Sequence, residues 1–188
     1  MQLEIIPAKK EHASASAELI LHAMEDLIYF YIGEENKEKA IEFLQQQFLL
    51  EDSLYSYYNT LVAISDKKIV GILIAYDAKY HLPLQQKLQL FLKENYAFDG
   101  NLNPETKAGE FYLDALSVDP AYRGKKIGSQ LIQFAEKIAL ENKHSHIGLL
   151  VDLENPKAKC LYERIGFQAV NKVRLGKHSY EHLQKKLD

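Results

Sequence analysis

The part of this 188-residue chain best suited to chemistry is a basic turn between a predicted strand and a predicted helix. Arg123, Lys125 and Lys126 place three cations within four residues, and Gly124 and Gly128 let a ligand approach the backbone closely. Unpaired N–H groups at a helix start carry partial positive charge, so the turn could hold a phosphate. It matches neither common nucleotide-binding glycine pattern, and spacing alone leaves a solvated turn equally open.

A carboxylate lies on the strand that precedes this turn. Strict alternation predicts two strand faces, with Tyr112, Asp114, Leu116 and Val118 on one, and Phe111, Leu113, Ala115 and Ser117 on the other. Because most of the first face is apolar, desolvation would raise the pKa of Asp114 toward that of a useful general base. The alternative is an Asp that neighbouring backbone groups satisfy or that faces water beside a cleft.

Two segments of the chain resemble motifs of one enzyme family. Arg123-Gly-Lys-Lys-Ile-Gly128 is similar to the Gln/Arg-x-x-Gly-x-Gly/Ala pyrophosphate loop of the GNAT superfamily of acyl-CoA-dependent N-acetyltransferases. Residues 155–167, Asn-Pro-Lys-Ala-Lys-Cys-Leu-Tyr-Glu-Arg-Ile-Gly-Phe, resemble that family's Asn-x-x-Ala-x-x-Leu-Tyr-x-x-x-Gly-Phe segment. The resemblance covers residues 60–187 closely and the first 60 by element order. Lys126 departs from the family pattern, which usually has Gly at that position.

The resemblance implies a site for acetyl-CoA as cosubstrate. It implies that the strands at 110–118 and 147–153 are parallel neighbours that splay apart, so that the pantetheine arm enters the gap and pairs with backbone groups near Leu116 and Val118. The diphosphate would then lie on the amides of residues 124–129. The implied cofactor-binding residues are Leu116, Ser117, Val118, Arg123, Gly124, Lys125, Lys126, Ile127, Gly128, Ser129, Asn155 and Lys157.

The resemblance also implies catalytic roles. Tyr162 occupies the position of the family's usual general acid, and many relatives carry an acidic residue near the position of Asp114. An ordinary phenol is a weaker acid than a thiol, so protonating the departing thiolate needs assistance of roughly 2 kcal/mol from the site or from water. Cys160 lies nearly opposite Tyr162 on a helix. We therefore predict that Cys160 is a buried apolar filler, and that transfer is direct within a ternary complex.

Apolar periodicity predicts the elements that must position these residues. Strands are predicted at 3–6, 60–65, 69–76, 110–118, 147–153, 167–175 and 179–187. Helices are predicted up to Gly33, from Asn36, and at 81–95, 126–142 and 155–166; the first has one face formed by Ala15, Leu19, Ala23, Leu27 and Phe30. With the resemblance, this predicts an α/β fold: one GNAT-like domain over 1–188 whose mixed central β-sheet of about six to seven strands is flanked by helices, with a helical excursion between the third and fourth strands.

Composition limits the other functions. The formal net charge of −3 and the scattered Lys pairs argue against nucleic acid as a partner, and no apolar run approaches the ~20 residues that span a membrane. A single Cys and the lack of a signal-peptide pattern predict a cytoplasmic protein. His144 and His146 are two residues apart with no third ligand nearby, so no metal site is predicted.

The predicted partner is a small-molecule or peptide amine. Aromatic clusters at 29–31 and 55–58 could line its pocket, since aromatic faces favour cations, although such residues more often form core and rim. Asp152 and Glu154 could act through water or be solvated. The alternative function is an acyl-CoA-binding sensor with the same fold and little turnover. The final run, Tyr180–Leu187, could form a homodimer contact.

Overall fold

A seven-stranded mixed sheet forms the centre of the molecule, with strand order β1-β2-β3-β4-β5-β7-β6. The computed structural model describes residues 3–175 and 178–188. The strands are β1 (Leu3–Pro7), β2 (Thr60–Ser65), β3 (Lys68–Asp77), β4 (Phe111–Val118), β5 (His146–Asp152), β6 (Gln168–Leu175) and β7 (His178–Lys186). Neighbouring strands are antiparallel except β4 and β5, which are parallel. The predicted α/β class and the mixed sheet of six to seven strands are confirmed, and the strands follow one another along the chain at the predicted places.

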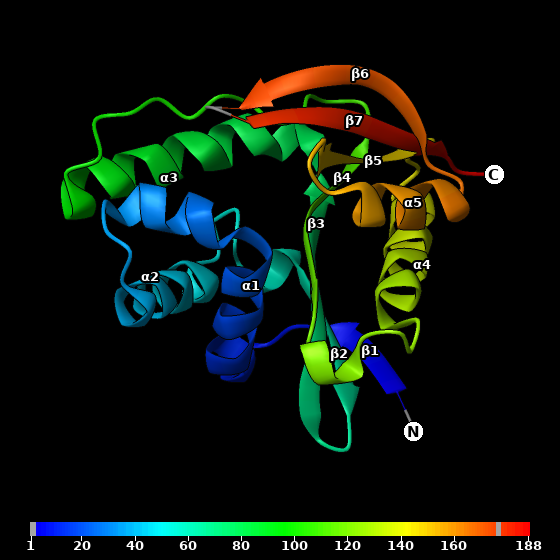
Figure 1. The fold of residues 1–188 in the computed structure, drawn as a ribbon, viewed down its shortest axis with the longest axis horizontal. Coiled ribbons are helices and arrows are strands. Elements are labelled where there is room, and N and C mark those ends of the chain that lie inside the picture. Colours follow the sequence, from blue (N-terminus) through cyan, green and yellow to red (C-terminus); the bar gives the residue numbers. More distant parts are fainter. Residues whose placement is uncertain (1–2, 176–177) are drawn as a thin grey trace.

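Helices cover both faces of this sheet. They are α1 (Ala13–Ile32), α2 (Lys37–Leu49), α3 (His81–Tyr96), α4 (Ile127–Glu141) and α5 (Pro156–Arg164). The first three lie on one side of the sheet, and α4 and α5 lie on the other (Figure 1). Over the ranges that the structure describes, no helix is both long and apolar enough to cross a bilayer.

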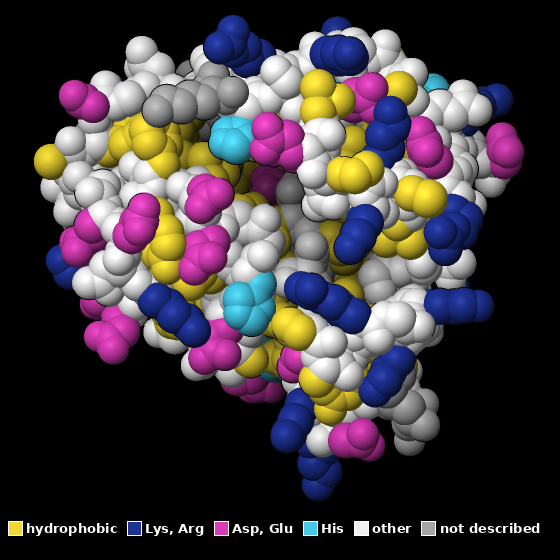
Figure 2. Space-filling view, viewed as in Figure 1, with side chains coloured by type: hydrophobic (Ala, Val, Ile, Leu, Met, Phe, Trp, Pro, Cys, Tyr) yellow, Lys and Arg dark blue, Asp and Glu magenta, His cyan; other side chains and the backbone are white. Residues whose placement is uncertain are grey.

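Charge is distributed unevenly around a hollow in the surface. Figure 2 shows this hollow near the middle of the face viewed, with acidic side chains gathered on the side of α1 and α3. Most of the Lys and Arg side chains near the hollow lie on the side of α4 and α5. The two sides of the sheet therefore offer different electrostatic surroundings to anything bound between them.

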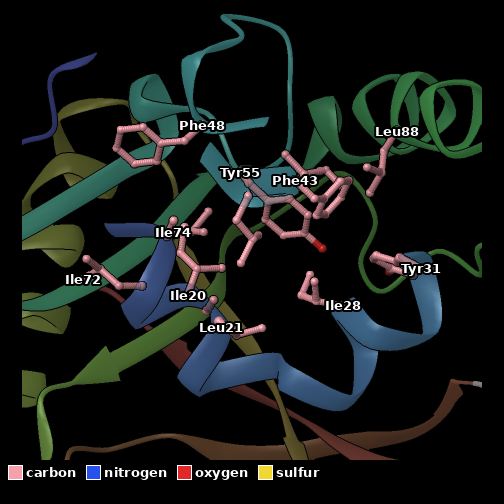
Figure 3. Close-up of a cluster of buried hydrophobic side chains, with 14 of the residues drawn as sticks. Ile20, Leu21, Ile28, Tyr31, Phe43, Phe48, Tyr55, Ile72, Ile74 and Leu88 are labelled. Carbon is pink, nitrogen blue, oxygen red and sulfur yellow. The ribbon is translucent and has the colours of Figure 1, made fainter. Parts of the chain in front are cut away.

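Each face of the sheet has its own apolar core. The larger core joins α1, α2 and α3 to the sheet, and its members Ile20, Phe43, Tyr55 and Ile74 are drawn in Figure 3. The second core lies between the sheet and α4 and includes Leu131. Full burial of each large apolar side chain stabilises the fold by about 1.5–3 kcal/mol. The two cores therefore hold the central strands from both sides.

Helix α1 changes direction at Met24, whose φ of −145° and ψ of 39° are not helical. After this kink, Ile28 and Tyr31 are buried and Phe30 is 61% exposed. The single helical face predicted to run from Ala15 to Phe30 is therefore wrong: Ala15 and Ala23 are already exposed before the kink, and the kink leaves Phe30 exposed after it. Tyr31 lies close enough to Glu105 and Asp114 for their charges to add to burial in raising the pKa of its hydroxyl.

Strand β4 contains a β-bulge at Asp114. The partners of Leu113 and Ala115 on β3 are adjacent residues, which leaves Asp114 as the extra residue. Ala115 joins Tyr112 in the core beneath α1, whereas Leu116 packs against the core beneath α4. The predicted strict alternation is therefore wrong beyond Asp114, because the bulge moves the side chains of Ala115 and Leu116 to the faces opposite those predicted.

Strands β4 and β5 part soon after they begin. Their parallel pairing covers residues 111–113 of β4 and 147–149 of β5 and then stops. Strand β5 remains paired with β7 as far as Asp152. Among the residues that the structure describes, the edge of β4 from Asp114 to Val118 therefore has no strand partner on the β5 side. Apart from the Val118 carbonyl, which accepts from the Arg123 side chain, the backbone groups on this edge can bind an extended ligand. The prediction that these strands are parallel neighbours that splay apart is confirmed.

Candidate functional site

The turn after β4 ends in the uncapped start of α4. Gly124 and Lys126 both have left-handed backbone conformations, with φ of 77° and 62°. Lys126 is the N-cap residue, its side chain makes no capping hydrogen bond, and the Gln130 N–H donates to its carbonyl. The N–H groups of residues 127–129 have no acceptor among the residues that the structure describes. Free N–H groups of this kind form an anion site.

Three cations surround this helix start. The Arg123 Nε donates to the Val118 carbonyl at 3.3 Å, which ties the turn to the end of β4. The Lys125 ammonium lies 4.5 Å from the ring centre of Tyr122, and Lys126 is exposed. Among the ion pairs within residues 3–175 and 178–188, none includes these three cations. All three can therefore contribute to binding a polyanion.

Asp114 lies half-buried at the bulge, where β4 and β5 part. The Tyr76 hydroxyl donates to Asp114 Oδ2 at 2.6 Å, and it lies 3.0 Å from His81 Nδ1. Because the Glu105 N–H donates to His81 Nε2 at 3.1 Å, the His81 proton belongs on Nδ1 and is donated to Tyr76. Burial lowers the pKa of His81 to about 4, so the ring is neutral near pH 7. This chain fixes Oδ2 and leaves Oδ1 of Asp114 free of any described partner.

Burial raises the pKa of Asp114 to about 6, although the hydrogen bond from Tyr76 acts in the opposite direction. The rise predicted from the sequence is confirmed. A carboxyl with such a pKa is largely ionised near pH 7 and is a stronger base than an ordinary carboxylate. Asp114 therefore has the properties of a general base.

A second carboxylate, Glu105, lies beside Asp114. It comes from the connection between α3 and β4, and the Tyr112 hydroxyl donates to its Oε2 at 2.9 Å. Burial and the nearby charge of Asp114 both raise the pKa of Glu105. No spacing in the sequence points to Glu105, Tyr76 or His81, because they come from separate elements that only the folded chain brings together.

Tyr162 lies on α5, across the sheet from Asp114. Its ring packs edge-on against Phe167 with the ring centres 5.9 Å apart, and it contacts the same core as Leu116 and Val118. Burial raises the pKa of Tyr162 to about 12, so the phenol keeps its proton at neutral pH. Asp114 and Tyr162 therefore belong to the two opposite faces of the sheet beside the β4–β5 gap.

Helix α5 begins at the predicted residue but exposes its cysteine. The Asn155 side chain caps the helix by accepting from the Ala158 N–H at 3.1 Å, and Lys157 is exposed in the first turn. Cys160 is exposed, with its Sγ 3.8 Å from the Arg164 guanidinium. The prediction that Cys160 is a buried filler is wrong, because α5 lies at the surface and buries none of its described residues fully.

The structure places one group of possible metal ligands together within residues 3–175 and 178–188. Asp152, Glu154 and His178 offer atoms within 4.8 Å of one another. Asp152 already accepts from the Glu154 N–H at 2.8 Å and lies 3.2 Å from His178 Nδ1. This group joins the end of β5 to the start of β7 and contains neither His144 nor His146. His144 lies instead 3.4 Å from Asp77.

The predicted aromatic clusters separate in the fold. Tyr31 and Tyr55 are buried beneath α1 and α2, whereas the Tyr29 hydroxyl donates to Glu25 on the surface. The Tyr57 and Tyr58 rings stack on each other with centres 4.4 Å apart, and Tyr58 is exposed. Only Tyr31 and Tyr55 of these tyrosines have a pKa that the charges of Asp114 and Glu105 raise, in addition to burial.

The sequence signature of the Acetyltransferase (GNAT) family matches residues 21–167. This range includes the basic turn, the β4–β5 gap, Asp114 and helix α5. The chain belongs to the GNAT acetyltransferase family.

Similar proteins agree with this assignment. The GNAT chain is 30% identical to Acetyltransferase Atu2258 of Agrobacterium fabrum over 113 aligned residues. These residues make up 59% of this chain and 81% of that protein. A crystal structure of an acetyltransferase is 32% identical, with a TM-score of 0.82 over 98% of this chain and 100% of that one. The N-acetyltransferase from Staphylococcus aureus Mu50, at 24% identity, shares the fold with a TM-score of 0.85 over 96% and 99% of the two chains.

The backbone at Lys126 explains the usual glycine of the GNAT family at this position. Its φ of 62° lies in the left-handed region, which costs a residue with a side chain roughly 1–2 kcal/mol. Gly128 shows a different requirement: an added Cβ would lie 3.5 Å from Leu116 and 3.9 Å from Val118. A larger side chain at Gly128 would therefore fill the space beside the free edge of β4.

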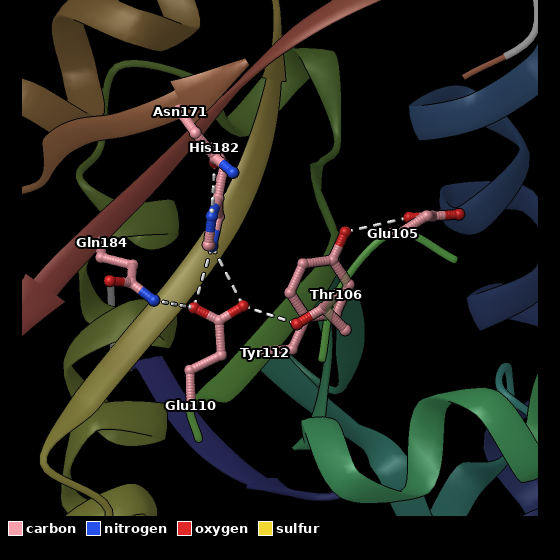
Figure 4. A network of polar contacts seen from close by, with 7 residues as sticks. All are labelled: Glu105, Thr106, Glu110, Tyr112, Asn171, His182 and Gln184. Atoms are coloured by element: carbon pink, nitrogen blue, oxygen red, sulfur yellow. Dashed lines mark hydrogen bonds and ion pairs between the residues drawn. The ribbon is translucent and has the colours of Figure 1, made fainter. Parts of the chain in front are cut away.

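A buried polar network holds the start of β4 in this GNAT chain against β7. Glu110 accepts from Thr106 Oγ1 at 2.5 Å and from Gln184 Nε2 at 2.6 Å, and both its oxygens lie within 3.0 Å of His182 Nε2 (Figure 4). Gly148 on β5 makes room for this carboxylate, since an added Cβ would lie 1.9 Å from Glu110 Oε2. The network also anchors Thr106, the neighbour of Glu105.

The Glu110 carboxylate stabilises the fold in its ionised form. Burial alone would raise its pKa, but the hydrogen bonds from His182, Thr106 and Gln184 outweigh that effect and lower it. A carboxyl whose pKa is lower in the folded than in the unfolded chain contributes stability above its unfolded pKa. That contribution is lost as the pH falls through the lowered pKa, so the network weakens only in acid.

Proposed function

We propose that this GNAT chain is an acetyl-CoA-dependent N-acetyltransferase that transfers the acetyl group to a primary amine by direct attack in a ternary complex. The observation that carries this proposal is the convergence of three features: the free edge of β4, the uncapped start of α4, and Asp114 at the bulge between them. Membership of the family supports acetyl transfer in general.

The residues present fit coenzyme A. The N–H and C=O groups that β4 presents to the gap over residues 114–118, other than the Val118 carbonyl that Arg123 contacts, can pair with the amides of the pantetheine arm as a neighbouring strand would. The N–H groups of residues 127–129, together with Arg123, Lys125 and Lys126, can hold the diphosphate. The bound cosubstrate supplies the acetyl group as a thioester, with a thiolate as leaving group.

Asp114 prepares the acceptor nitrogen for attack. A primary amine is mainly an ammonium ion near pH 7 and then has no lone pair to donate. Because Tyr76 holds Oδ2, the ammonium gives its proton to the open Oδ1 of Asp114. The neutral nitrogen forms the C–N bond as the C–S bond breaks, and it then loses its second proton to water, while the thiolate gains a proton from a donor in the site that is reprotonated by solvent. Tyr162, protonated at neutral pH, is the side chain that we propose as the source of that last proton.

Replacing Tyr162 by Phe should lower kcat about 10–100-fold and should change the dissociation constant for CoA much less. The effect should lie at the lower end for a general acid, because the raised pKa of Tyr162 makes it a weak donor and lets water share the task. Steady-state kinetics and calorimetric titration with CoA measure the two quantities. Tyr58→Phe, at a tyrosine that is 64% exposed, is the control. A fully active Tyr162→Phe enzyme would end the proposed role.

Replacing Arg123 by Glu should weaken CoA binding about 10–100-fold and leave the fold intact. The substitution removes a charge-assisted contact and adds a negative charge beside the proposed diphosphate site. Because Arg123 is exposed, the loss should shrink at high ionic strength, which titrations at two salt concentrations would measure. Arg174→Glu, an exposed reversal on β6, is the matched control. Unchanged affinity would remove the basic turn from the binding site.

A thiol-release assay tests the proposed function itself. Acetyl-CoA and the purified protein are incubated with a panel of amines, and free CoA thiol is measured with and without each amine. The proposal expects thiol release that depends on at least one primary amine and yields the corresponding amide. Tight CoA binding without thiol release for any amine would instead support the acyl-CoA sensor.

A further inference from the structure

A buried histidine links the proposed base to the connection between α3 and β4. His81 is the first residue of α3, and its side chain is fully buried. Its Nδ1 lies 3.0 Å from the Tyr76 hydroxyl, and its Nε2 accepts from the Glu105 N–H at 3.1 Å. The Tyr76 ring lies within 10° of parallel to the imidazole, and Tyr112 packs edge-on against it with ring centres 6.0 Å apart. Packing and hydrogen bonds therefore hold the His81 ring in one orientation.

The two contacts of His81 allow a single protonation state. Burial lowers the pKa of His81 to about 4, so the ring carries one proton near pH 7. A proton on Nε2 would point at the Glu105 N–H, so the proton lies on Nδ1 and is donated to the Tyr76 oxygen. The opposite tautomer would present a lone pair to Tyr76 and would compete with Asp114 for the hydroxyl proton. The Glu105 N–H thus determines the direction in which Tyr76 donates.

Asp114 receives the only proton that the Tyr76 hydroxyl can donate. The donor–acceptor distance of 2.6 Å to Asp114 Oδ2 is typical of a strong hydrogen bond to a carboxylate. This bond stabilises the ionised carboxyl and acts against burial, which raises the pKa of Asp114. The bond that Tyr76 accepts from His81 polarises the hydroxyl, so it strengthens the bond that Tyr76 donates.

The other titratable groups near Asp114 supply no competing hydrogen bond. Those that its charge affects come from the α3–β4 connection, β4, α1 and the α2–β2 connection: Glu105, Tyr112, Tyr31 and Tyr55. Burial and the charge of Asp114 raise the pKa of Glu105 to about 8, so the two carboxyls together carry about one negative charge near pH 7. Within residues 3–175 and 178–188, no cation forms an ion pair with Asp114, and Tyr76 is its one hydrogen-bond donor.

We propose that His81 is a positioning residue for acetyl transfer: it makes the Tyr76 hydroxyl donate to Oδ2 of Asp114, so that Oδ1 is the oxygen that accepts the ammonium proton. The inference rests on the proposed function, in which Asp114 is the base. If the hydroxyl turned toward His81 instead, Asp114 would lose the hydrogen bond that stabilises its charge, and it would ionise only at higher pH. The α3–β4 connection takes part through the backbone N–H of Glu105.

The tautomer of His81 can be measured without any substrate. In protein with isotope-labelled histidine, long-range proton–nitrogen correlation spectra distinguish a protonated ring nitrogen from one with a lone pair. The His81 signals are those that disappear in His81→Asn. They should show the proton on Nδ1 and should not change between about pH 6 and 8, because the pKa of His81 is about 4. A proton on Nε2, or a ring that titrates in this range, would overturn the inference.

The effect of Tyr76 on the base is measured from the pH profile of kcat/KM in the thiol-release assay. Tyr76→Phe removes the hydrogen bond to Asp114, so the acid limb should move upward by about one pH unit from its native position near pH 6. As a result, kcat/KM should fall about fivefold at pH 6 and return close to the native value above pH 8. A change that only disturbs the structure would lower kcat/KM by the same factor at every pH. Tyr80→Phe, at a tyrosine that is 53% exposed, is the control and should leave the limb in place.

Two substitutions of His81 separate its hydrogen bond to Tyr76 from its packing. Asn places an amide nitrogen near the position of Nδ1, so His81→Asn can still donate to Tyr76 and should keep the limb near pH 6. Leu fills similar space but donates nothing, so His81→Leu should move the limb in the same direction as Tyr76→Phe does. A limb that stays in place in Tyr76→Phe or in His81→Leu would overturn the inference, and so would one that moves equally in His81→Asn.

The proposed function and this inference can fail separately. If no amine releases thiol, the proposed function fails, and the Asp114 carboxyl is then titrated by carbon NMR in the native protein and in Tyr76→Phe. Loss of the hydrogen bond should raise the pKa of Asp114 in the variant by about one unit. Equal pKa values in the two proteins would overturn the inference on their own.

Discussion

Replacing Asp114 by Asn is expected to lower kcat by about 10²–10⁴-fold, the usual loss when a general base is removed. Asn keeps the size of the side chain and can still accept the Tyr76 hydrogen bond, but it cannot take the ammonium proton. Since the pKa of Asp114 is raised to about 6, kcat/KM of the native enzyme should rise with pH through that value. The variant should lack this limb in a profile from pH 5 to 9.

The pH profile of kcat/KM also tests whether a residue other than Asp114 is the general base. Asp66→Asn, at an exposed turn between β2 and β3, is the control and should keep both the rate and the limb. A limb near pH 6 that persists in Asp114→Asn would exclude Asp114 and would point to Glu105, the other carboxylate in the site. Because the two interact, the limb of the native enzyme belongs to the pair rather than to one residue.

Asp114→Asn should also make the protein more stable near neutral pH. A carboxyl whose folded pKa is raised favours the folded chain below its unfolded pKa, and this benefit is lost as the pH rises through the folded value. Asn has no charge to bury, so the free energy of unfolding of the variant should exceed that of the native protein above about pH 6. The difference should disappear below about pH 4, where the Asp114 carboxyl is protonated in both the folded and the unfolded chain. A variant that is inactive and more stable would separate catalysis from folding.

Much of the fold could be predicted because the relevant signals are local. In α4, Ile127 and Leu131 repeat at helical spacing and are both buried, and the β2–β3 hairpin consists of two β-rich runs joined by a short polar turn. The Asn36 side chain caps α2 as predicted, accepting from the Lys39 N–H. The prediction that β4 and β5 separate came from the resemblance to the GNAT family, because the periodicity of apolar residues does not show where two strands separate.

The features that could not be predicted depend on contacts between distant segments. The bulge at Asp114 exists because β3 pairs out of step with β4, so the sequence of β4 alone suggests regular alternation. Glu105 lies in an irregular connection, and its role depends on Tyr112 and on the neighbouring Asp114. No proline or glycine lies near Met24, so the sequence does not predict the kink there.

Replacing Gly148 by Ala should lower the free energy of unfolding by about 3–5 kcal/mol, the cost of breaking a buried charge from its partners. The added Cβ would lie 1.9 Å from Glu110 Oε2 and 2.4 Å from its carboxyl carbon, so the side chain must leave its place. If the Glu110 side chain moves away, His182 and Gln184 lose their hydrogen bonds to its carboxylate. For a chain of this size the melting temperature should fall by about 10 °C, which denaturant and thermal unfolding would both detect.

A double-mutant cycle shows whether the Glu110 carboxylate causes this loss. In a Glu110→Ala background the space above Gly148 is empty, so adding Gly148→Ala should cost little, and the two changes should be non-additive by 2 kcal/mol or so. Additive losses would mean that the β5 backbone, and not the clash, is responsible. A non-additive result would show that the Glu110 carboxylate holds the start of β4 against β7 and requires glycine at position 148.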